Sequence, residues 1–311
     1  MDKSASVLSK LKNKAKQSGK AVQVHLQLFC QEEFLRKLSL SKYADNFVLK
    51  GGLFIYTLTN FESRATVDVD FLMRSLPNSI EEMEKIIRAI LLVNTGNDFI
   101  SLEVQEIKNI SAQRKYPGVS FKIIGKIKNT KTPFNVDIGV GDIIVPKSKN
   151  RTIPVQLDKF TAPEIITYSL ESTIAEKFDA ILDRLEMTSR MKDFYDIYYL
   201  SNIFNFDGRK LQEAIFETLQ NRGTAYNRNS LNQISEFVKD KDMQTKWTHF
   251  LKRVMCSKIE FVVVINNILQ FLSPIYQAIL DENEFFKSWD KDKKRMVVIK
   301  SKLDLDFMKK L

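Results

Sequence analysis

The sequence is poor in several residue types, and each shortage removes a class of protein. Its 311 residues include two cysteines, Cys30 and Cys256, which lack the paired spacing of a zinc site. A disulfide framework is therefore not expected, and a reducing compartment fits best. The two histidines, His25 and His249, stand outside any motif, which argues against histidine-based acid–base or zinc chemistry. No GxxxxGK[ST] sequence occurs, which argues against a P-loop NTPase.

Long apolar runs are also missing. The first twenty residues carry lysines without the continuous apolar stretch of a secretion signal. The most apolar segment, FVVVINNILQFL from Phe261, is interrupted by Asn266 and Asn267. We therefore expect a soluble, cytoplasmic protein without a membrane partner.

What is present is an ordinary globular composition with a basic excess. Hydrophobic residues make up 44% of the chain, which is enough for packed cores, and the length suggests two domains. The formal net charge of +10 favours a polyanionic partner, because lysine and arginine release counterions when they meet phosphates. Charge alone does not separate RNA, DNA and a membrane surface.

Residue periodicity divides the chain into two parts. Apolar residues recur at helical spacing from Val7 to about Tyr43, which predicts an amphipathic helical lead-in. Polar and apolar residues then alternate in four segments, which predicts strands beginning near Thr66, Leu102, Val119 and Pro133. Between them, a helix is expected after Ser79, which can cap it. The first part is therefore α+β with a mixed or antiparallel sheet.

The second part shows helical periodicity throughout. Thr161 and Glu164 form a capping-box signal for its first helix, and further apolar faces follow to Leu280. We predict an α/β catalytic domain at residues 1–160 and a helical domain at residues 161–311.

The motif with the clearest chemistry is Asp68-Val-Asp70. Alternate residues of a strand point to one face, so the two carboxylates come together without distortion and can share a Mg²⁺ or Mn²⁺ ion. Val67, Val69 and Phe71 are expected to face the core. Taken alone, a DxD sequence is more often a solvated strand face.

Two neighbouring features support the metal interpretation. Gly51-Gly52 precedes a predicted helix, whose free N–H groups can hold phosphate oxygens, although a glycine pair is more often a plain turn. Asp137, in another predicted strand, can add a third carboxylate, although it can equally cap a turn. Three carboxylates on adjacent strands suit two metal ions that stabilise the attacking and leaving oxygens of a phosphoryl displacement.

These residues also carry a family resemblance. The order of glycine pair, helix, DxD strand and later aspartate resembles the nucleotidyltransferase superfamily related to DNA polymerase beta. Three blocks together resemble the AbiEii/AbiGii abortive-infection toxins of type IV toxin–antitoxin systems: KGGLFIYTLTNFESRATVDVDF from Lys50, YSLESTIAEKFDAILDR from Tyr168 and RMKDFYDIYYL from Arg190. The resemblance implies an α+β fold with a nucleotidyltransferase-like mixed sheet and flanking helices, followed by a predominantly helical C-terminal domain that completes the active site.

The resemblance also assigns roles to residues. It implies that Asp68, Asp70 and Asp137 hold the metal and that Gly51, Gly52, Arg64, Thr66 and Asp196 bind the nucleotide. Lys177 matches the lysine that neutralises the triphosphate, and Asp193 matches the acidic residue that positions Lys177 or the nucleotide. Without the resemblance, a helical lysine and a KDxxD sequence are more often a solvated helix face, and Tyr195, Tyr198 and Tyr199 are more often core than base-stacking residues.

The function implied is transfer of a nucleotidyl group from an NTP to an RNA acceptor, with tRNA favoured. The expected NTP is GTP or a pyrimidine nucleoside triphosphate. Growth arrest in phage defence would follow. The partner implied is an antitoxin that represses transcription without forming a stable complex with the toxin. Basic residues after Asn221, interleaved with aromatics, can contact RNA or simply confer solubility. Two alternatives stay open, namely a protein or small-molecule hydroxyl as acceptor, and a non-catalytic nucleic-acid-binding module.

Overall fold

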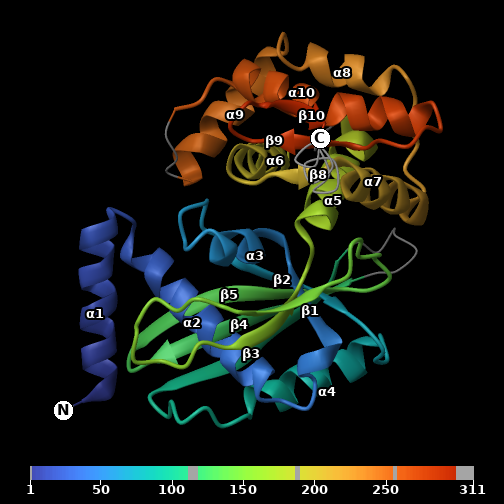
Figure 1. Cartoon of the computed structure of the whole chain (residues 1–311). Helices are drawn as coiled ribbons and strands as arrows, with labels where there is room; N and C mark the ends of the chain where they lie inside the picture. Colours follow the sequence, from blue (N-terminus) through green and yellow to red (C-terminus); the bar gives the residue numbers. More distant parts are fainter. Residues whose placement is uncertain (1, 111–117, 186–189, 255–257, 299–311) are drawn as a thin grey trace, which may run out of the picture. The chain divides into compact units, whose positions relative to one another are not determined.

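The computed structural model divides the chain into two compact units (Figure 1). The first contains Met1–Asp142 and Ser148–Tyr168, and the second contains Ile143–Lys147 and Ser169–Leu311. The main boundary between the two units therefore falls after Tyr168, whereas the sequence analysis placed it after residue 160. The residues that the structure describes are 2–110, 118–185, 190–254 and 258–298.

The first unit is built on a seven-stranded mixed sheet, as the sequence predicts for the fold class. The strand order is β3-β4-β5-β2-β1-β7-β6. β2 runs parallel to β5 and antiparallel to β1, and β1 runs parallel to β7. The strands are β1 (Phe47–Lys50), β2 (Asp68–Met73), β3 (Ile100–Ile110), β4 (Gly118–Ile127), β5 (Thr130–Gly139), β6 (Lys149–Thr152) and β7 (Glu164–Thr167).

Helices of this unit pack on the sheet and on one another. They are α1 (Lys3–Ser18), α2 (Val22–Ser39), α3 (Gly51–Leu58) and α4 (Ile80–Leu91), with a 3₁₀ turn η1 (Ala44–Asn46) before β1. The predicted helical lead-in is thus two helices, α1 and α2, which separate at the left-handed Gly19. The predicted cap of α4 is confirmed, because the Ser79 hydroxyl accepts the Glu82 N–H at 3.3 Å.

The expected capping box at Thr161 and Glu164 is wrong. Residues 164–167 form strand β7 instead, because they pair with β6 and β1, and the Tyr168 N–H donates to the Leu49 carbonyl. The first helix of the second unit begins only at Leu170, where Ser169 caps it by accepting the Ser172 N–H at 3.0 Å. Tertiary pairing overrode the local capping signal here.

The second unit is predominantly helical, as predicted. Its helices are α5 (Leu170–Arg184), α6 (Met191–Ile203), α7 (Gly208–Arg222), α8 (Ser230–Glu236), α9 (Lys241–Val254) and α10 (Phe261–Leu280). A small antiparallel sheet, which the sequence analysis missed, joins β8 (Phe206–Asp207), β9 (Lys287–Asp290) and β10 (Arg295–Val298). Trp289 of β9 is buried in this unit, where its indole N–H donates to the Ser201 carbonyl at 2.6 Å.

Helix α10 qualifies the expectation that no segment could span a bilayer. In the described part of the chain, Phe261–Leu280 is long and apolar enough to do so by length and composition. Half of its most apolar window is buried, however, and Asn267 accepts a hydrogen bond from Ser201 at 2.7 Å. These contacts are those of a core helix.

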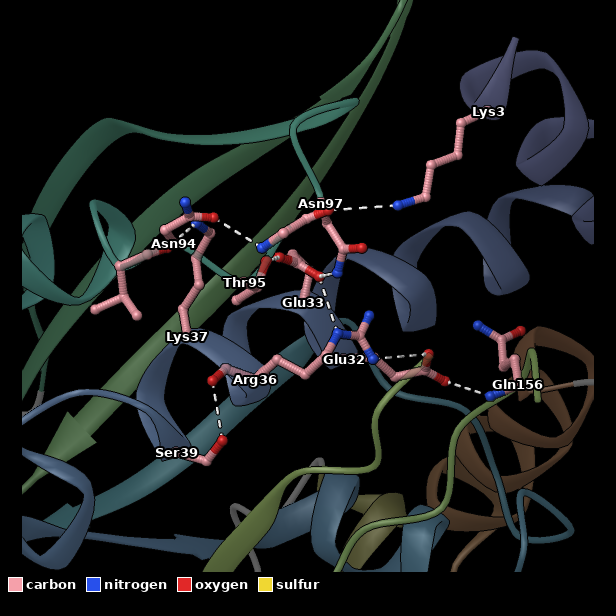
Figure 2. A network of polar contacts seen from close by, with 12 residues as sticks. Lys3, Glu32, Glu33, Arg36, Lys37, Ser39, Asn94, Thr95, Asn97 and Gln156 are labelled. Carbon is pink, nitrogen blue, oxygen red and sulfur yellow. Dashed lines mark hydrogen bonds and ion pairs between the residues drawn. The ribbon is translucent and has the colours of Figure 1, made fainter. Parts of the chain in front are cut away.

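A buried polar network ties α2 to the rest of the first unit (Figure 2). The Glu33 carboxylate accepts hydrogen bonds from Arg36 at 2.9 Å, from Asn97 at 2.8 Å and from the Thr95 hydroxyl. Glu32, one residue earlier, accepts the Gln156 N–H at 2.8 Å, while its other oxygen has no hydrogen-bond donor within the described residues. Arg36 therefore hydrogen-bonds to Glu33, whereas its guanidinium group approaches Glu32 only to 3.9 Å.

Glu32 makes the stability of the fold depend on pH. Desolvation raises its pKa from 4.5 to about 7, although Arg36 and the Gln156 hydrogen bonds oppose that shift. The folded chain therefore binds more protons than the unfolded chain between pH 4.5 and about 7, so stability falls as the pH rises through this window. Glu32→Gln should flatten the dependence and raise the free energy of unfolding at pH 8 by up to about 3 kcal/mol.

Urea unfolding at pH 5 and pH 8 measures both quantities. Glu62→Gln, a change at an exposed glutamate of the same unit, is the control and should follow the parent protein at both pH values. If Glu32→Gln and the parent lose the same stability between pH 5 and pH 8, Glu32 does not titrate in this range.

Candidate active site

The sheet brings the predicted metal-binding residues together on one face. Asp68 and Asp70 lie two residues apart on β2, and parallel pairing places Asp70 in register with Asp137 of β5. The intervening Val69 is buried on the opposite face with Phe71. Val67, expected to be buried there, is 44% exposed because it precedes the strand. Asp137 is inside β5, so it is not a turn cap.

Neighbouring side chains that the sequence analysis missed hold two of these carboxylates. The Ser120 hydroxyl of β4 donates to Asp137 Oδ1 at 2.6 Å, and the Asn135 amide donates to Asp68 Oδ1 at 3.0 Å. Asn135 could have been found by the same alternation that identified Asp137, whereas Ser120 required the register between β4 and β5. These bonds restrict the rotamers of the two aspartates.

The first turn of α3 lies directly against the DxD strand. The helix begins at Gly51, as predicted, with a left-handed φ of +68°. A Cβ atom added to Gly51 would lie 2.0 Å from Asp70 Oδ2, and one on Gly52 would lie 3.1 Å from the Thr66 side chain. The glycines therefore let the helix start approach the carboxylates closely.

Hydrogen bonds near the first turn of α3 hold the start of β2 in place. The Asp68 N–H donates to Thr66 Oγ1 at 3.3 Å, and Gln31 of α2 donates to the Thr66 and Val67 carbonyls at 3.1 and 3.0 Å. Arg64 is buried. Lys50, in register with Asp70 on β1, forms an ion pair with Asp142 at 2.6 Å.

The carboxylates suit a divalent cation in ligand type. Carboxylate oxygens are the ligands that Mg²⁺ prefers, and it is commonly bound by one or two carboxylates together with substrate phosphates and water. Asp70 and Asp137, opposite each other on adjacent strands, fit such a pair. No three or more His, Cys, Asp or Glu side chains gather closely enough to hold a metal by themselves among the described residues. Metal binding stays a prediction.

A hollow of about 490 Å³ opens where β2 and β5 end. It is bordered by the turn from Leu72 to Asn78 and by Val140–Asp142, and none of the predicted site residues lines it. Its position at the far ends of these strands separates it from Asp68, at the first residue of β2.

Lys177 of α5 lies in a buried ionic cluster of the second unit. Its ammonium group is 2.6 Å from Asp196 Oδ2 and 3.3 Å from Asp193 Oδ1, both on α6. Arg190 also pairs with Asp193. Lys177 is 8% exposed and the two aspartates at most 1%, so these are not residues of a solvated helix face.

Of the three tyrosines beside this cluster, Tyr195 belongs to the core, whereas Tyr198 and Tyr199 are partly exposed. Tyr195 is buried and stacks on Tyr199 with ring centroids 5.8 Å apart, and it also contacts Trp247 and Phe250. Packing accounts for Tyr195. That Lys177, Asp193 and Asp196 serve the same nucleotide as the aspartates of the first unit stays a prediction.

Lys177→Ala is expected to destabilise the protein, because it removes the buried ammonium group that pairs with Asp196 and Asp193. Breaking such a pair typically costs about 3–5 kcal/mol, which urea unfolding would detect. Lys192→Ala, at an exposed lysine on α6, should change stability by less than about 0.5 kcal/mol.

A double variant separates stability from catalysis. Lys177→Met with Asp196→Asn removes both charges and should regain most of the lost stability. Turnover that stays low in this stable variant supports a role in nucleotide use. If Lys177→Ala unfolds with the same free energy as the parent protein, the buried ion pair predicted to stabilise the fold is contradicted.

A known protein family matches most of this chain. The family described as "Nucleotidyl transferase AbiEii toxin, Type IV TA system" matches residues 33–262, which is about three quarters of the chain. The chain belongs to this AbiEii family. Membership makes it a nucleotidyltransferase toxin of the type IV toxin–antitoxin class, with a nucleotide substrate and an antitoxin partner. The resemblance stated from its sequence blocks is thereby confirmed.

Similar solved structures include nucleotidyltransferases of low sequence identity. The toxin MenT4 of Mycobacterium tuberculosis H37Rv is 16% identical, with a TM-score of 0.48 over 78% of this AbiEii chain and 73% of its own. JHP933 of Helicobacter pylori is 14% identical, with a TM-score of 0.43 over 81% and 92% of the two chains. No curated protein matches this AbiEii chain.

Proposed function

We propose that this AbiEii-family chain transfers a nucleotidyl group from an NTP to an RNA acceptor, with tRNA as the target, using Mg²⁺ or Mn²⁺. The observation that carries the proposal is the register of β2 with β5, which sets Asp70 opposite Asp137 with the start of α3 against it. A phosphate-binding helix start beside paired carboxylates is the arrangement that phosphoryl-group chemistry needs.

The residues of the first unit would take different roles according to their positions. Asp68, Asp70 and Asp137 would hold the divalent metal, which supplies charge stabilisation for the phosphorus centre. The N–H groups at Gly51 and Gly52 would bind triphosphate oxygens. Asp137, oriented by Ser120, would accept the proton of the acceptor hydroxyl at its carboxylate.

Other roles follow the family resemblance. Lys177 would neutralise the triphosphate, with Asp193 and Asp196 setting the position of its ammonium group. Arg64 and Thr66 would bind the nucleotide, and GTP or a pyrimidine NTP is the expected donor. In the cytoplasm, modification of tRNA would arrest growth during phage infection, and the antitoxin would act through transcription without a stable complex.

The experiment that tests the function incubates purified protein with Mg²⁺, each α-labelled NTP in turn and total cellular RNA. Label is expected on RNA of tRNA size with one preferred NTP, and chelation of the metal should abolish it. Label on protein or on small molecules would move the acceptor to those classes. Absence of label in every fraction would favour a binding module that retains the fold.

A further inference from the structure

The sheet face that carries the carboxylates continues beyond them onto β4. Asp68 is in register with Asn135 of β5, and Asn135 is in register with Lys122 of β4. Residues in register on adjacent strands share a face, so these three side chains form one row. Within this row, Asn135 donates its hydrogen bond to Asp68.

Lys122 differs from the other lysines of this region. It is half-buried, yet in the part of the chain that the structure describes its ammonium group makes neither a hydrogen bond nor an ion pair. Lys126, on the same strand and the same face, pairs with Glu103 at 2.5 Å. Glu106, opposite Lys122 on β3, is bound by Lys108 at 2.9 Å and affects Lys122 only as a nearby charge.

A half-buried ammonium group of this kind has lost part of its hydration without gaining a bonded partner. An anion placed above the row would restore that interaction as a charge-assisted hydrogen bond. The carboxylates on the neighbouring strands are engaged: Asp68 accepts from Asn135, Asp137 accepts from Ser120, and Glu106 pairs with Lys108. The missing partner is therefore expected to come from a ligand.

The strand order indicates which ligand supplies that anion. Along β1-β2-β5-β4, the glycines that open α3 are on the β1 side of the carboxylates, whereas Lys122 is on the β4 side. The triphosphate of the donor is assigned to the glycine side. Lys122 lies two strands, or about 10 Å, from the strand of Asp68, on the flank opposite the glycines, and this flank is left for the acceptor.

We propose that Lys122 binds a backbone phosphate of the acceptor RNA on the β4 side of the carboxylates. This inference rests on the proposed function, because it takes the donor to lie at the glycines. It assigns to the first unit a specific acceptor contact, separate from the basic residues of the helical half. Lys122 is a binding residue in this proposal and has no part in proton transfer.

The test compares two lysines that differ mainly in position. Lys122→Gln and Lys126→Gln each remove one positive charge from the same face of β4, so non-specific attraction of RNA falls equally in both. Each is placed in the Asp68→Asn/Asp70→Asn background, and binding of 5′-labelled bulk tRNA is followed by fluorescence anisotropy. The same lysine changes in the active protein give separate KM values for tRNA and for the NTP.

Lys122→Gln should raise the Kd for tRNA roughly tenfold and lower the slope of log affinity against log salt by about 1. Lys126→Gln should change the Kd by less than about twofold. The KM for tRNA should rise in Lys122→Gln while the KM for the NTP stays constant. Equal effects of the two substitutions, or a rise confined to the KM for the NTP, would overturn the proposal.

Failure of this inference is distinguishable from failure of the function. If the parent protein labels no RNA but Lys122→Gln alone weakens tRNA binding, the contact stands and the catalytic assignment falls. If RNA is labelled and Lys122→Gln binds tRNA as tightly as its background, the function stands and the contact is refuted.

Discussion

Asp70→Asn is expected to lower NTP-dependent labelling of the acceptor by about a thousandfold or more and to remove toxicity in growing cells. The change replaces one carboxylate oxygen with an amide nitrogen and so removes a negative charge from the face shared with Asp68 and Asp137. Charge stabilisation by a bound metal is worth several kcal/mol, and each 1.36 kcal/mol is a factor of ten in rate. Labelling assays and colony counts after induction measure the two effects.

Asp158→Asn is the matched control, because Asp158 is exposed and belongs to the same unit. It should label the acceptor at the parent rate. Both variants should unfold within about 0.5 kcal/mol of the parent, since asparagine preserves side-chain size. Full toxicity in a stable, well-expressed Asp68→Asn/Asp70→Asn protein would refute the catalytic assignment of this face.

Gly51→Ala should abolish most of the activity through a steric effect on the carboxylate. The added methyl group would lie 2.0 Å from Asp70 Oδ2 and 2.6 Å from its Cγ, so the side chain or the start of α3 must move. The left-handed φ of +68° adds about 1–2 kcal/mol of backbone strain. We expect a loss of at least about a hundredfold in the labelling rate, because misplacement by one ångström costs on that order.

Gly19→Ala separates these two contributions. Gly19 has the same φ of +68°, but no atom lies within 4 Å of an added Cβ. It should lose stability through strain and keep its turnover. Gly52→Ala, with Thr66 at 3.1 Å, should fall between the two. If Gly19→Ala and Gly51→Ala lose activity equally, strain rather than displacement of Asp70 is responsible.

The local part of this site was predictable from the sequence. Strict alternation around Asp68 and Asp70 identified their strand, and the glycine pair identified the start of α3. Such signals depend only on neighbours in the chain. The same holds for Ser79, whose side chain caps α4 as expected.

The parts that failed depend on pairing between distant segments. β7 was read as a helix start, since the strands that pair with it, β1 and β6, are not visible in its own residues. Likewise, the register that sets Ser120 beside Asp137 and Lys122 beside Asn135 cannot be derived from either strand alone. The hairpin of β9 and β10 was missed because its turn contains no glycine, and Lys294 adopts the positive φ instead.

The order of strands also bears on when the toxin becomes active during its synthesis. β2 precedes β3, β4 and β5 in the chain but pairs directly with β5, so Asp137 joins the aspartates of β2 only through a long-range contact. A nascent chain on the ribosome therefore carries the DxD strand while β3 and β4 are being made, without carrying the assembled carboxylates. On the proposed role of Asp137, a chain terminated prematurely in that interval is expected to contain Asp68 and Asp70 and yet be inactive.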